Sequence, residues 1–269
     1  MCEKGFNISV ANRSEAKVDT CVARYEKEIL GDEALAADAG KLEGFKDLRK
    51  FVDSLKKPRC IMFLVKAGSA VDETIEKFKA VVEEGDILID GGNEWFENTE
   101  RRSKELEAVG IRYLAVGVSG GEEGARKGPS IMPGGPRDAW DVIAPIFTKV
   151  AAQVDGQPCT AYLGKGGAGN YVKMVHNGIE YGDMQLIAEA YDILKHIAGM
   201  SNDELSATFA EWNRGKLQSY LIEITSTIFA KKDDDVYDST GAKVESKGEY
   251  VVDQVLDCTA NKGTRSEER

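Results

Sequence analysis

The sequence contains no uninterrupted apolar run of about 18 residues, so we expect no membrane-spanning helix. The opening residues, Met1-Cys-Glu-Lys-Gly, lack the apolar core of a signal peptide. The five cysteines are scattered, odd in number and never spaced as CxxC, which argues against a disulfide framework or a zinc site. This cysteine usage favours a reducing compartment, so we predict a cytoplasmic protein, and a plastid location stays open.

Positive charge is also in short supply. The 35 basic residues are outnumbered by 46 acidic ones, and the net charge of −11 argues against general nucleic-acid binding. An anionic ligand would therefore need a local positive pocket. The hydrophobic content of 42% is enough for a substantial core, and 269 residues suffice for one large or two medium domains.

Predicted strands and helices alternate over the first 163 residues. We expect a largely parallel α/β sheet with helices on both faces, followed by helices. The predicted strands are 7–11, 60–65, 86–90, 111–116, a short one within 127–135, and 161–163. The predicted helices are 14–25, 48–55, 70–82, 97–107, 136–151, a long one after residue 169, 201–212, 216–228 and 251–260.

The first predicted strand ends in Asn12, Arg13 and Ser14. In a dinucleotide-binding fold, an acidic residue at this strand end binds the 2′-hydroxyl of NAD, and an arginine accommodates the 2′-phosphate of NADP. Arg13 therefore indicates NADP, and Ser14 offers a further donor. A plain turn with a solvated arginine is the alternative interpretation of this motif alone.

Three later strand ends carry further binding signals. Small residues after residue 65 would let a nicotinamide or ribose approach the backbone closely, and Asn93 would point into the crevice where open α/β sheets bind ligands. Ser119, Gly120 and Gly121 could hold a carboxylate or hydroxyls through their hydroxyl and amide groups. A plain turn would need only one or two of the glycines found there.

The segment 173–181 is predicted to be helical, with five polar side chains on one face: Lys173, His176, Asn177, Glu180 and Tyr181. We expect the opposite side, with Met174, Val175 and Ile179, to pack. The alternative is a polar stripe that simply faces water. The preceding run 164–169 matches G-x-G-x-x-G, but it follows several strand–helix units, so we interpret it as a hinge between domains.

Six motifs together resemble the 6-phosphogluconate dehydrogenase family, in the family's order. They are Asn12–Ser14, Val65–Gly68, Ile89–Asn93, Gly117–Ala125, Lys127–Gly135 and Lys173–Gln185. The resemblance implies a Rossmann-like NADP-binding domain at 1–164 and the first part of a helical substrate and dimerisation domain at 165–269. It also leads us to expect that the family's first strand and Gly-rich loop, and most of its helical domain, are missing.

By this resemblance, the chain would oxidise and decarboxylate 6-phosphogluconate with NADP, without a metal, as a homodimer. Lys173 resembles the general base and Glu180 the acid. Substrate-binding positions would be Asn93, Ser119, Gly120, Gly121, His176, Asn177, Tyr181, Lys262 and Thr264. Cofactor-binding positions would be Asn12, Arg13, Ser14, Val65, Lys66, Ala67 and Asn93.

Two other functions stay open at this point. The chain could be a 3-hydroxyacid dehydrogenase of the same superfamily, which shares the helix-borne lysine and the glycine-rich loop. It could also be an inactive truncated form that acts at most as a binding module. Because the expected Gly-rich loop is missing, we predict weak or no NADPH formation by the 269-residue chain.

Overall fold

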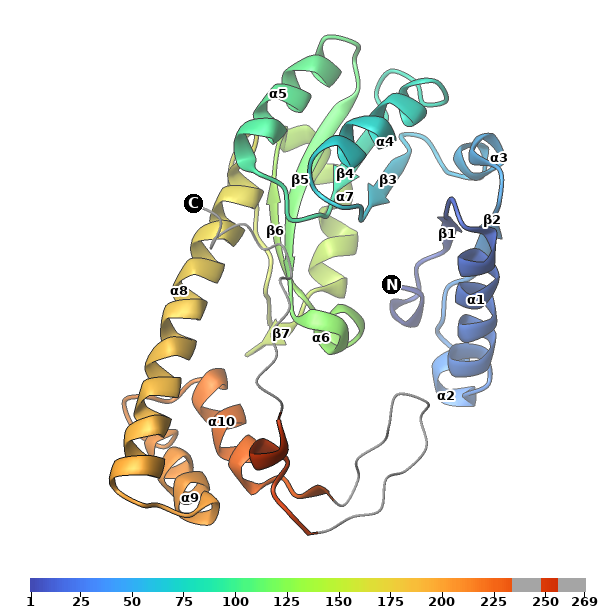
Figure 1. Ribbon diagram of the computed structural model, residues 1–269. Helices are drawn as coiled ribbons and strands as arrows, with labels where there is room; N and C mark the ends of the chain where they lie inside the picture. The colour runs from blue at the N-terminus through green and yellow to red at the C-terminus, as the bar shows by residue number, and fades with distance from the viewer. Residues whose placement is uncertain (234–247, 256–269) are drawn as a thin grey trace. The chain divides into compact units, whose positions relative to one another are not determined.

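The computed structural model describes residues 1–233 and 248–255 (Figure 1). The chain divides into two compact units, the first ending at His176 and the second beginning at Asn177. The predicted domain boundary at residue 164 stays a prediction.

The first unit alternates strands and helices, as the sequence predicts. Its strands are β1 (Ile8–Ala11), β2 (Leu42–Phe45), β3 (Cys60–Phe63), β4 (Ile87–Asp90), β5 (Arg112–Ser119), β6 (Ser130–Gly134), β7 (Gln153–Val154) and β8 (Gln157–Pro158). Its helices are α1 (Glu15–Tyr25), α2 (Glu33–Ala36), α3 (Leu48–Asp53), α4 (Ser69–Lys79), α5 (Phe96–Glu107), α6 (Gly121–Lys127) and α7 (Arg137–Val150). Short 3-10 and π-helical turns occupy Cys2–Lys4 and Glu26–Leu30.

The strands form a four-stranded sheet in the order β3-β4-β5-β6, a separate parallel pair, β1-β2, and a short antiparallel pair, β7-β8. Strands β3, β4 and β5 are parallel, and β6 runs antiparallel to β5, with Ser119 opposite Ser130. The carboxyl ends of β3 and β4 therefore lie at the same edge of the sheet. This edge carries the segments that the sequence marks as ligand-binding.

Helices cover both faces of the four-stranded sheet. Leu88 and Tyr113 point into a core with α3, α4 and α5, whereas Ile89 and Leu114 point into a second core with α7. This alternation of neighbouring residues follows from the pleat of a strand. The predicted class, a Rossmann-like sheet with helices on both faces followed by a helical part, is confirmed.

Several predicted elements were wrong or missed. Residues 161–163 form no strand; their neighbour Thr160 makes only a single bridge to Ile131. Strand β2, which pairs with β1, was missed because Leu-Glu-Gly-Phe has little strand character. Its glycine nevertheless lets α1 pack closely, because a Cβ on Gly44 would lie 2.7 Å from the Val18 side chain.

The first turn of helix α8 (Ala168–Asp192) lies directly against strands β5 and β6, and glycines make this approach possible. A Cβ on Gly169 would collide with the carbonyl oxygens of Ala115 and Met132. A Cβ on Gly117 would lie 2.6 Å from the Cβ of Lys173. The glycines therefore fix the position of Lys173 relative to the end of β5.

A buried ion pair joins the amino ends of β3 and β4. Arg59 Nη1 lies 2.9 Å from Asp86 Oδ2, with the two side chains 6% and 3% exposed. Asp86 also accepts hydrogen bonds from the backbone N–H groups of Arg59 and Glu83. Burial would raise the pKa of Asp86, but these hydrogen bonds and the guanidinium outweigh it and lower the pKa.

The second unit is helical. It contains the rest of α8, a π-helical turn (Ile193–Ile197), α9 (Asn202–Trp212), α10 (Tyr220–Ala230) and a 3-10 turn (Val251–Gln254). The capping box predicted at 201–204 is present, and α9 ends as predicted. Helix α10 starts at Tyr220, after turns, because Ser219 caps it. Of the helix predicted at 251–260, only this 3-10 turn lies in the described residues.

The core of the second unit is aromatic. The Tyr191 and Phe229 rings stack with centroids 5.2 Å apart, and the Phe209 ring packs against Phe229 in a tilted arrangement with centroids 5.5 Å apart. No helix in the described part of the chain is long and apolar enough to cross a membrane.

The tight packing of α8 predicts that Gly169→Ala destabilises the protein by about 1–3 kcal/mol, the usual cost of overpacking. Gly178→Ala in the same helix is the matched control, because a Cβ there meets no atom within 4 Å. Alanine is the better helix former by about 1 kcal/mol, so the control should be neutral or stabilising. Urea unfolding of both variants measures the difference; equal effects would contradict the packing argument.

The Arg59–Asp86 pair predicts a pH-dependent contribution to stability. Because folding lowers the pKa of Asp86, its contribution is present above the unfolded pKa of about 3.9 and is lost as pH falls through the folded pKa. We expect Asp86→Asn to cost on the order of 3 kcal/mol at pH 7 and clearly less near pH 3. Urea unfolding at both pH values tests this.

The control for that measurement is Asp138→Asn, which removes an exposed pair with Arg112. Exposed pairs contribute about 0–1 kcal/mol, so this variant should change the free energy of unfolding little. A loss at Asp86 that is the same at both pH values would refute the electrostatic interpretation.

Candidate active site

Lys173 lies at the carboxyl end of strand β5. Its Nζ donates a hydrogen bond to the carbonyl oxygen of Val118, the residue before Ser119. The side chain is partly buried, and it comes from the helix turn that Gly117 and Gly169 bring against the sheet. The predicted helix is confirmed, and its lysine faces the glycine-rich turn.

The turn between β5 and α6 contains the three residues predicted to hold the substrate. Ser119 closes β5, and Gly120 and Gly121 follow with φ angles of 138° and 60°, which favour glycine. A Cβ on Gly121 would meet nothing within 4 Å. The turn therefore needs glycine for its backbone conformation and leaves open space beside Gly121.

A small cavity brings Asn93 and Lys173 together, although they are 80 positions apart in the sequence. It is lined by Asn93, Glu94, Trp95, Phe96, Asn170, Lys173 and Met174. The loop after β4 and the first turns of α8 thus line the same cavity. The sequence predicts such a position for Asn93, because it follows the carboxyl end of a strand.

Asn170 is a buried polar residue of this region that sequence reasoning missed. Its Oδ1 accepts a hydrogen bond from Thr99 Oγ1 at 2.8 Å, and its Nδ2 donates to the carbonyl oxygen of Gly92 at 3.4 Å. It therefore ties α8 to α5 and to the residue before Asn93. Its place one turn before Lys173 on the same helix was the available signal.

Glu94 and Arg102 form a second missed feature, a buried ion pair with an N–O distance of 2.6 Å. Their side chains are 0% and 1% exposed. Glu94 also accepts hydrogen bonds from the backbone N–H groups of Gly68 and Trp95. Burial would raise the pKa of Glu94, but these donors and Arg102 lower it below its ordinary value.

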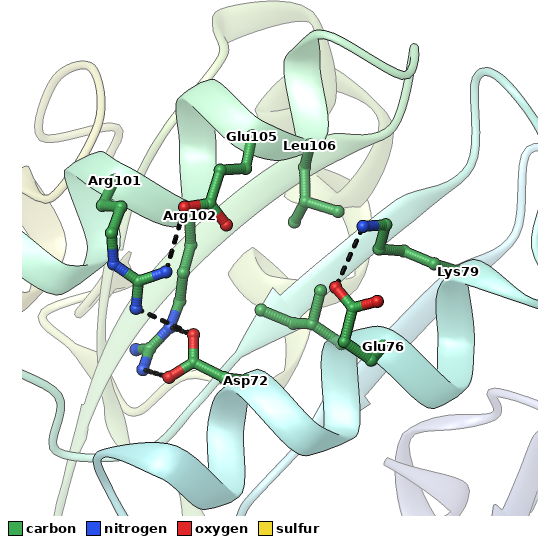
Figure 2. A pocket seen from close by; sticks show the side chains of 8 residues that line it. Asp72, Glu76, Lys79, Arg101, Arg102, Glu105 and Leu106 are labelled. Carbon is green, nitrogen blue, oxygen red and sulfur yellow. Dashed lines mark hydrogen bonds and ion pairs between the residues drawn. The ribbon is translucent and has the colours of Figure 1, made fainter.

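Arg102 also reaches helix α4, and Figure 2 shows its contacts with Asp72. Its Nε and Nη2 donate to the two carboxylate oxygens, each at 2.8 Å. Arg102, and to a lesser degree Arg101, hold the pKa of Asp72 well below its usual range. This bidentate pair joins α4 and α5.

The same side chains line a cavity of about 280 Å³ between α4 and α5 (Figure 2). Its charged groups pair with one another, as Arg101 does with Glu105 and Lys79 with Glu76. None of the residues predicted to bind ligand lines it. We therefore assign the candidate site to the smaller cavity beside Lys173.

The residues predicted to bind the cofactor, apart from Asn93, follow strands β1 and β3. Asn12, Arg13 and Ser14 end β1; all three are exposed, and the Asn12 side chain accepts a hydrogen bond from the Ser14 N–H at 2.8 Å. Val65, Lys66 and Ala67 follow β3 and lead to Gly68, the residue bonded to Glu94.

The remaining predicted residues of α8 keep the expected spacing in one continuous helix. His176 and Tyr181 are exposed, Asn177 is buried and Glu180 is partly buried. The expectation that Val175 and Ile179 pack was wrong: they are 42% and 62% exposed. Periodicity shows which side of a helix is apolar but not whether anything covers it. Lys262 and Thr264 lie outside the described residues.

Curated relatives and solved structures resemble this chain over nearly its whole length. The decarboxylating 6-phosphogluconate dehydrogenase 1 of Spinacia oleracea is 58% identical over 267 residues, which cover 98% of this chain and 50% of that protein. A Plasmodium falciparum 6-phosphogluconate dehydrogenase, studied in apo form and with NADP+ and 6-phosphogluconate, superposes with a TM-score of 0.83 at 47% identity. The match covers 98% of this chain and 52% of the solved one.

A more distant structure shares the fold alone. The 3-hydroxyisobutyrate dehydrogenase of Mycobacterium tuberculosis superposes with a TM-score of 0.56 at 17% identity, over 80% of this chain and 73% of that one. The chain spans about half the length of the curated relatives it matches, whereas it covers 73% of this more distant structure.

Two family models cover the chain almost completely. The NAD binding domain of 6-phosphogluconate dehydrogenase matches residues 1–164, and the 6-phosphogluconate dehydrogenase C-terminal domain matches residues 169–267. Together with the relatives, these matches show that the chain belongs to the 6-phosphogluconate dehydrogenase family.

Proposed function

We propose that this chain serves the NADP-dependent oxidative decarboxylation of 6-phospho-D-gluconate to D-ribulose 5-phosphate and CO₂, a step of the pentose phosphate pathway. The observation that carries the proposal is the position of Lys173, whose amine bonds the carbonyl of Val118 beside the Ser119–Gly121 turn. This position supports the role of general base that the family resemblance implies for Lys173.

In the proposed reaction, neutral Lys173 takes the proton of the substrate 3-hydroxyl while the C3 hydrogen leaves as hydride. NADP supplies the hydride acceptor. The resulting 3-keto acid loses its carboxylate as CO₂, the electron pair of the broken bond forms a carbon–carbon double bond, and protonated Lys173 returns its proton to the C3 oxygen, which gives an enediol. Glu180 then protonates C1 of the product, while Lys173 takes the proton of the enediol hydroxyl and the ketone forms. A general base must lie within hydrogen-bond reach of the proton that it takes, and the place of Lys173 beside the Ser119–Gly121 turn suits this role.

The nearby polar groups suit a sugar acid. Ser119, Gly120 and Gly121 would hold its carboxylate or hydroxyls through the hydroxyl and backbone N–H groups, and Asn93 would contact substrate and cofactor. His176 and Asn177 would bind hydroxyls of the substrate. We assign its phosphate to Tyr181, Lys262 and Thr264.

The cofactor residues fit a phosphorylated dinucleotide. Arg13 is exposed at the end of β1 in a turn held by Asn12, so its guanidinium is available to a 2′-phosphate. Val65, Lys66 and Ala67 would line the rest. We further propose that the protein acts in the cytoplasm as a homodimer.

Arg13→Ala tests the cofactor assignment. Removing a charged hydrogen-bond donor to the 2′-phosphate should weaken NADP binding by about 1.5–3 kcal/mol, roughly 10- to 150-fold in Kd. NAD binding should change little, and calorimetry measures both. Arg24→Ala, near the other end of α1, is the control and should leave both affinities unchanged. Equal losses for the two nucleotides would contradict the assignment.

Lys173→Met tests the reaction itself. NADPH formation is followed by absorbance at high protein concentration with 6-phosphogluconate or with 3-hydroxyisobutyrate. We expect slow turnover of 6-phosphogluconate that Lys173→Met lowers by at least about 100-fold, the lower range for a lost general base. Lys165→Met, in the turn before α8, should retain turnover.

A different substrate preference would refute the proposed reaction. NADPH formation with 3-hydroxyisobutyrate in place of 6-phosphogluconate would instead support a 3-hydroxyacid dehydrogenase. Turnover of 6-phosphogluconate that survives in Lys173→Met would refute the role of this lysine.

A further inference from the structure

We propose that Glu94 and Arg102 are positioning residues: together they hold the loop after β3 and the loop after β4 in one fixed arrangement that preforms the NADP-binding backbone. This inference rests on the proposed function, because the two loops contain Val65, Lys66, Ala67 and Asn93.

On the first loop, the ion pair holds both polar backbone atoms of one residue. The N–H of Gly68 donates to Glu94 Oε2 at 2.8 Å, and its carbonyl oxygen accepts from Arg102 Nη2 at 2.9 Å. Gly68 has a φ angle of 94°, which favours glycine, and it precedes the first turn of α4. The segment that ends at Gly68 therefore cannot shift without breaking two hydrogen bonds to buried charges.

On the second loop, the residues on either side of Asn93 are anchored. The N–H of Gly92 donates to Asp90 Oδ1 at 2.9 Å, and its carbonyl oxygen accepts from Asn170. On the other side, Glu94 Oε1 accepts from the N–H of Trp95 at 2.7 Å and from Asn98 Nδ2 at 3.1 Å. Asn93 is thus held between two fixed neighbours.

Neither charged group is exposed for contact with a ligand. Glu94 belongs to the lining of the candidate cavity and Arg102 to that of the larger one, but their side chains are only 0% and 1% exposed. Their charged atoms are engaged in hydrogen bonds with surrounding backbone and side-chain groups. Their influence on a bound nucleotide must therefore pass through the backbone of the two loops. That is positioning, and it differs from direct binding or catalysis.

The pair Arg59–Asp86 gives the matched comparison. It is also a buried arginine–carboxylate pair and also joins the segments next to β3 and β4, but it does so at their amino ends. Ligands of open α/β sheets bind at the carboxyl ends. Both pairs should therefore support folding, and only the Glu94–Arg102 pair should affect nucleotide affinity.

A loop that loses its anchor must be ordered when the ligand binds, and this ordering weakens affinity. We expect Glu94→Gln to raise the Kd for NADP about tenfold, because the amide NH₂ cannot accept a hydrogen bond from Gly68 or Arg102. Arg102→Lys keeps the charge but loses the planar fork of donors, so the rise in its Kd for NADP should lie between that of the unsubstituted chain and that of Glu94→Gln.

The experiment combines three measurements on the full 269-residue chain: amide hydrogen exchange at Gly68 and Trp95 without nucleotide, Kd for NADP by calorimetry, and Tm. In Glu94→Gln we expect faster exchange at Gly68, which loses its acceptor, little change at Trp95, whose acceptor oxygen is kept, and the raised Kd. Arg59→Lys and Asp86→Asn should lower Tm and leave both the exchange and the Kd unchanged. If Glu94→Gln does not fold, Asn98→Ala takes its place. It removes one donor to Glu94, so we expect faster exchange and a raised Kd as in Glu94→Gln, but smaller in size.

Three results would overturn the inference while leaving the proposed function intact: unchanged exchange at Gly68 in the Glu94 and Asn98 variants, faster exchange with unchanged Kd, or an equal rise in Kd in the Arg59 variant. Failure of the unsubstituted chain to bind NADP would instead overturn the cofactor assignment, and the role of the pair in nucleotide affinity with it.

Discussion

The close approach of helix α8 to strands β5 and β6 is the constraint on which the candidate site depends. Lys173 can bond the carbonyl of Val118 only because glycine stands at 117 and 169, where any side chain would collide with the opposing element. Van der Waals repulsion is steep, so such a contact defines position more sharply than a hydrogen bond does. The helix start, the end of β5 and the lysine thus form one rigid arrangement.

The sheet is secured at both ends by buried arginine–carboxylate pairs with different consequences. Arg59 and Asp86 join the strand starts, and Arg102 and Glu94 join the loops that follow the strand ends. A buried ion pair is a poor source of net stability, because removing two charges from water costs about as much as their attraction returns. Such a pair instead fixes geometry, because a buried guanidinium and a buried carboxylate bond each other well in only a few relative orientations.

Much of the fold and part of the site could be predicted from local sequence. Strand ends with Arg13, Asn93 and the glycines after Ser119 carry their signal in neighbouring residues, and the helix stripe from Lys173 carries it in spacing. Glu94 and Arg102 carry no such signal, and Asn170 carries only its place one turn before Lys173 on the same helix. Their role depends on partners 8 to 78 positions away, such as Gly68 for Arg102 and Gly92 for Asn170, which only the folded chain brings together. The exposure of Ile179 was unpredictable for the same reason, since packing depends on what lies opposite.

The buried arginines and the exposed cations at the strand ends differ in their electrostatic partners. The chain carries a net charge of −11, so the proposed ligands, an anionic nucleotide and a phosphorylated acid, would approach a surface that repels them overall. Within the described residues, Arg102 and Arg59 already neutralise carboxylates, whereas Arg13 and Lys66 form no ion pair there. Only a cation that is not committed to a protein carboxylate can compensate a ligand phosphate without first losing a partner. In our proposal, the buried arginines therefore organise the backbone, and the exposed cations at the strand ends are available to a ligand.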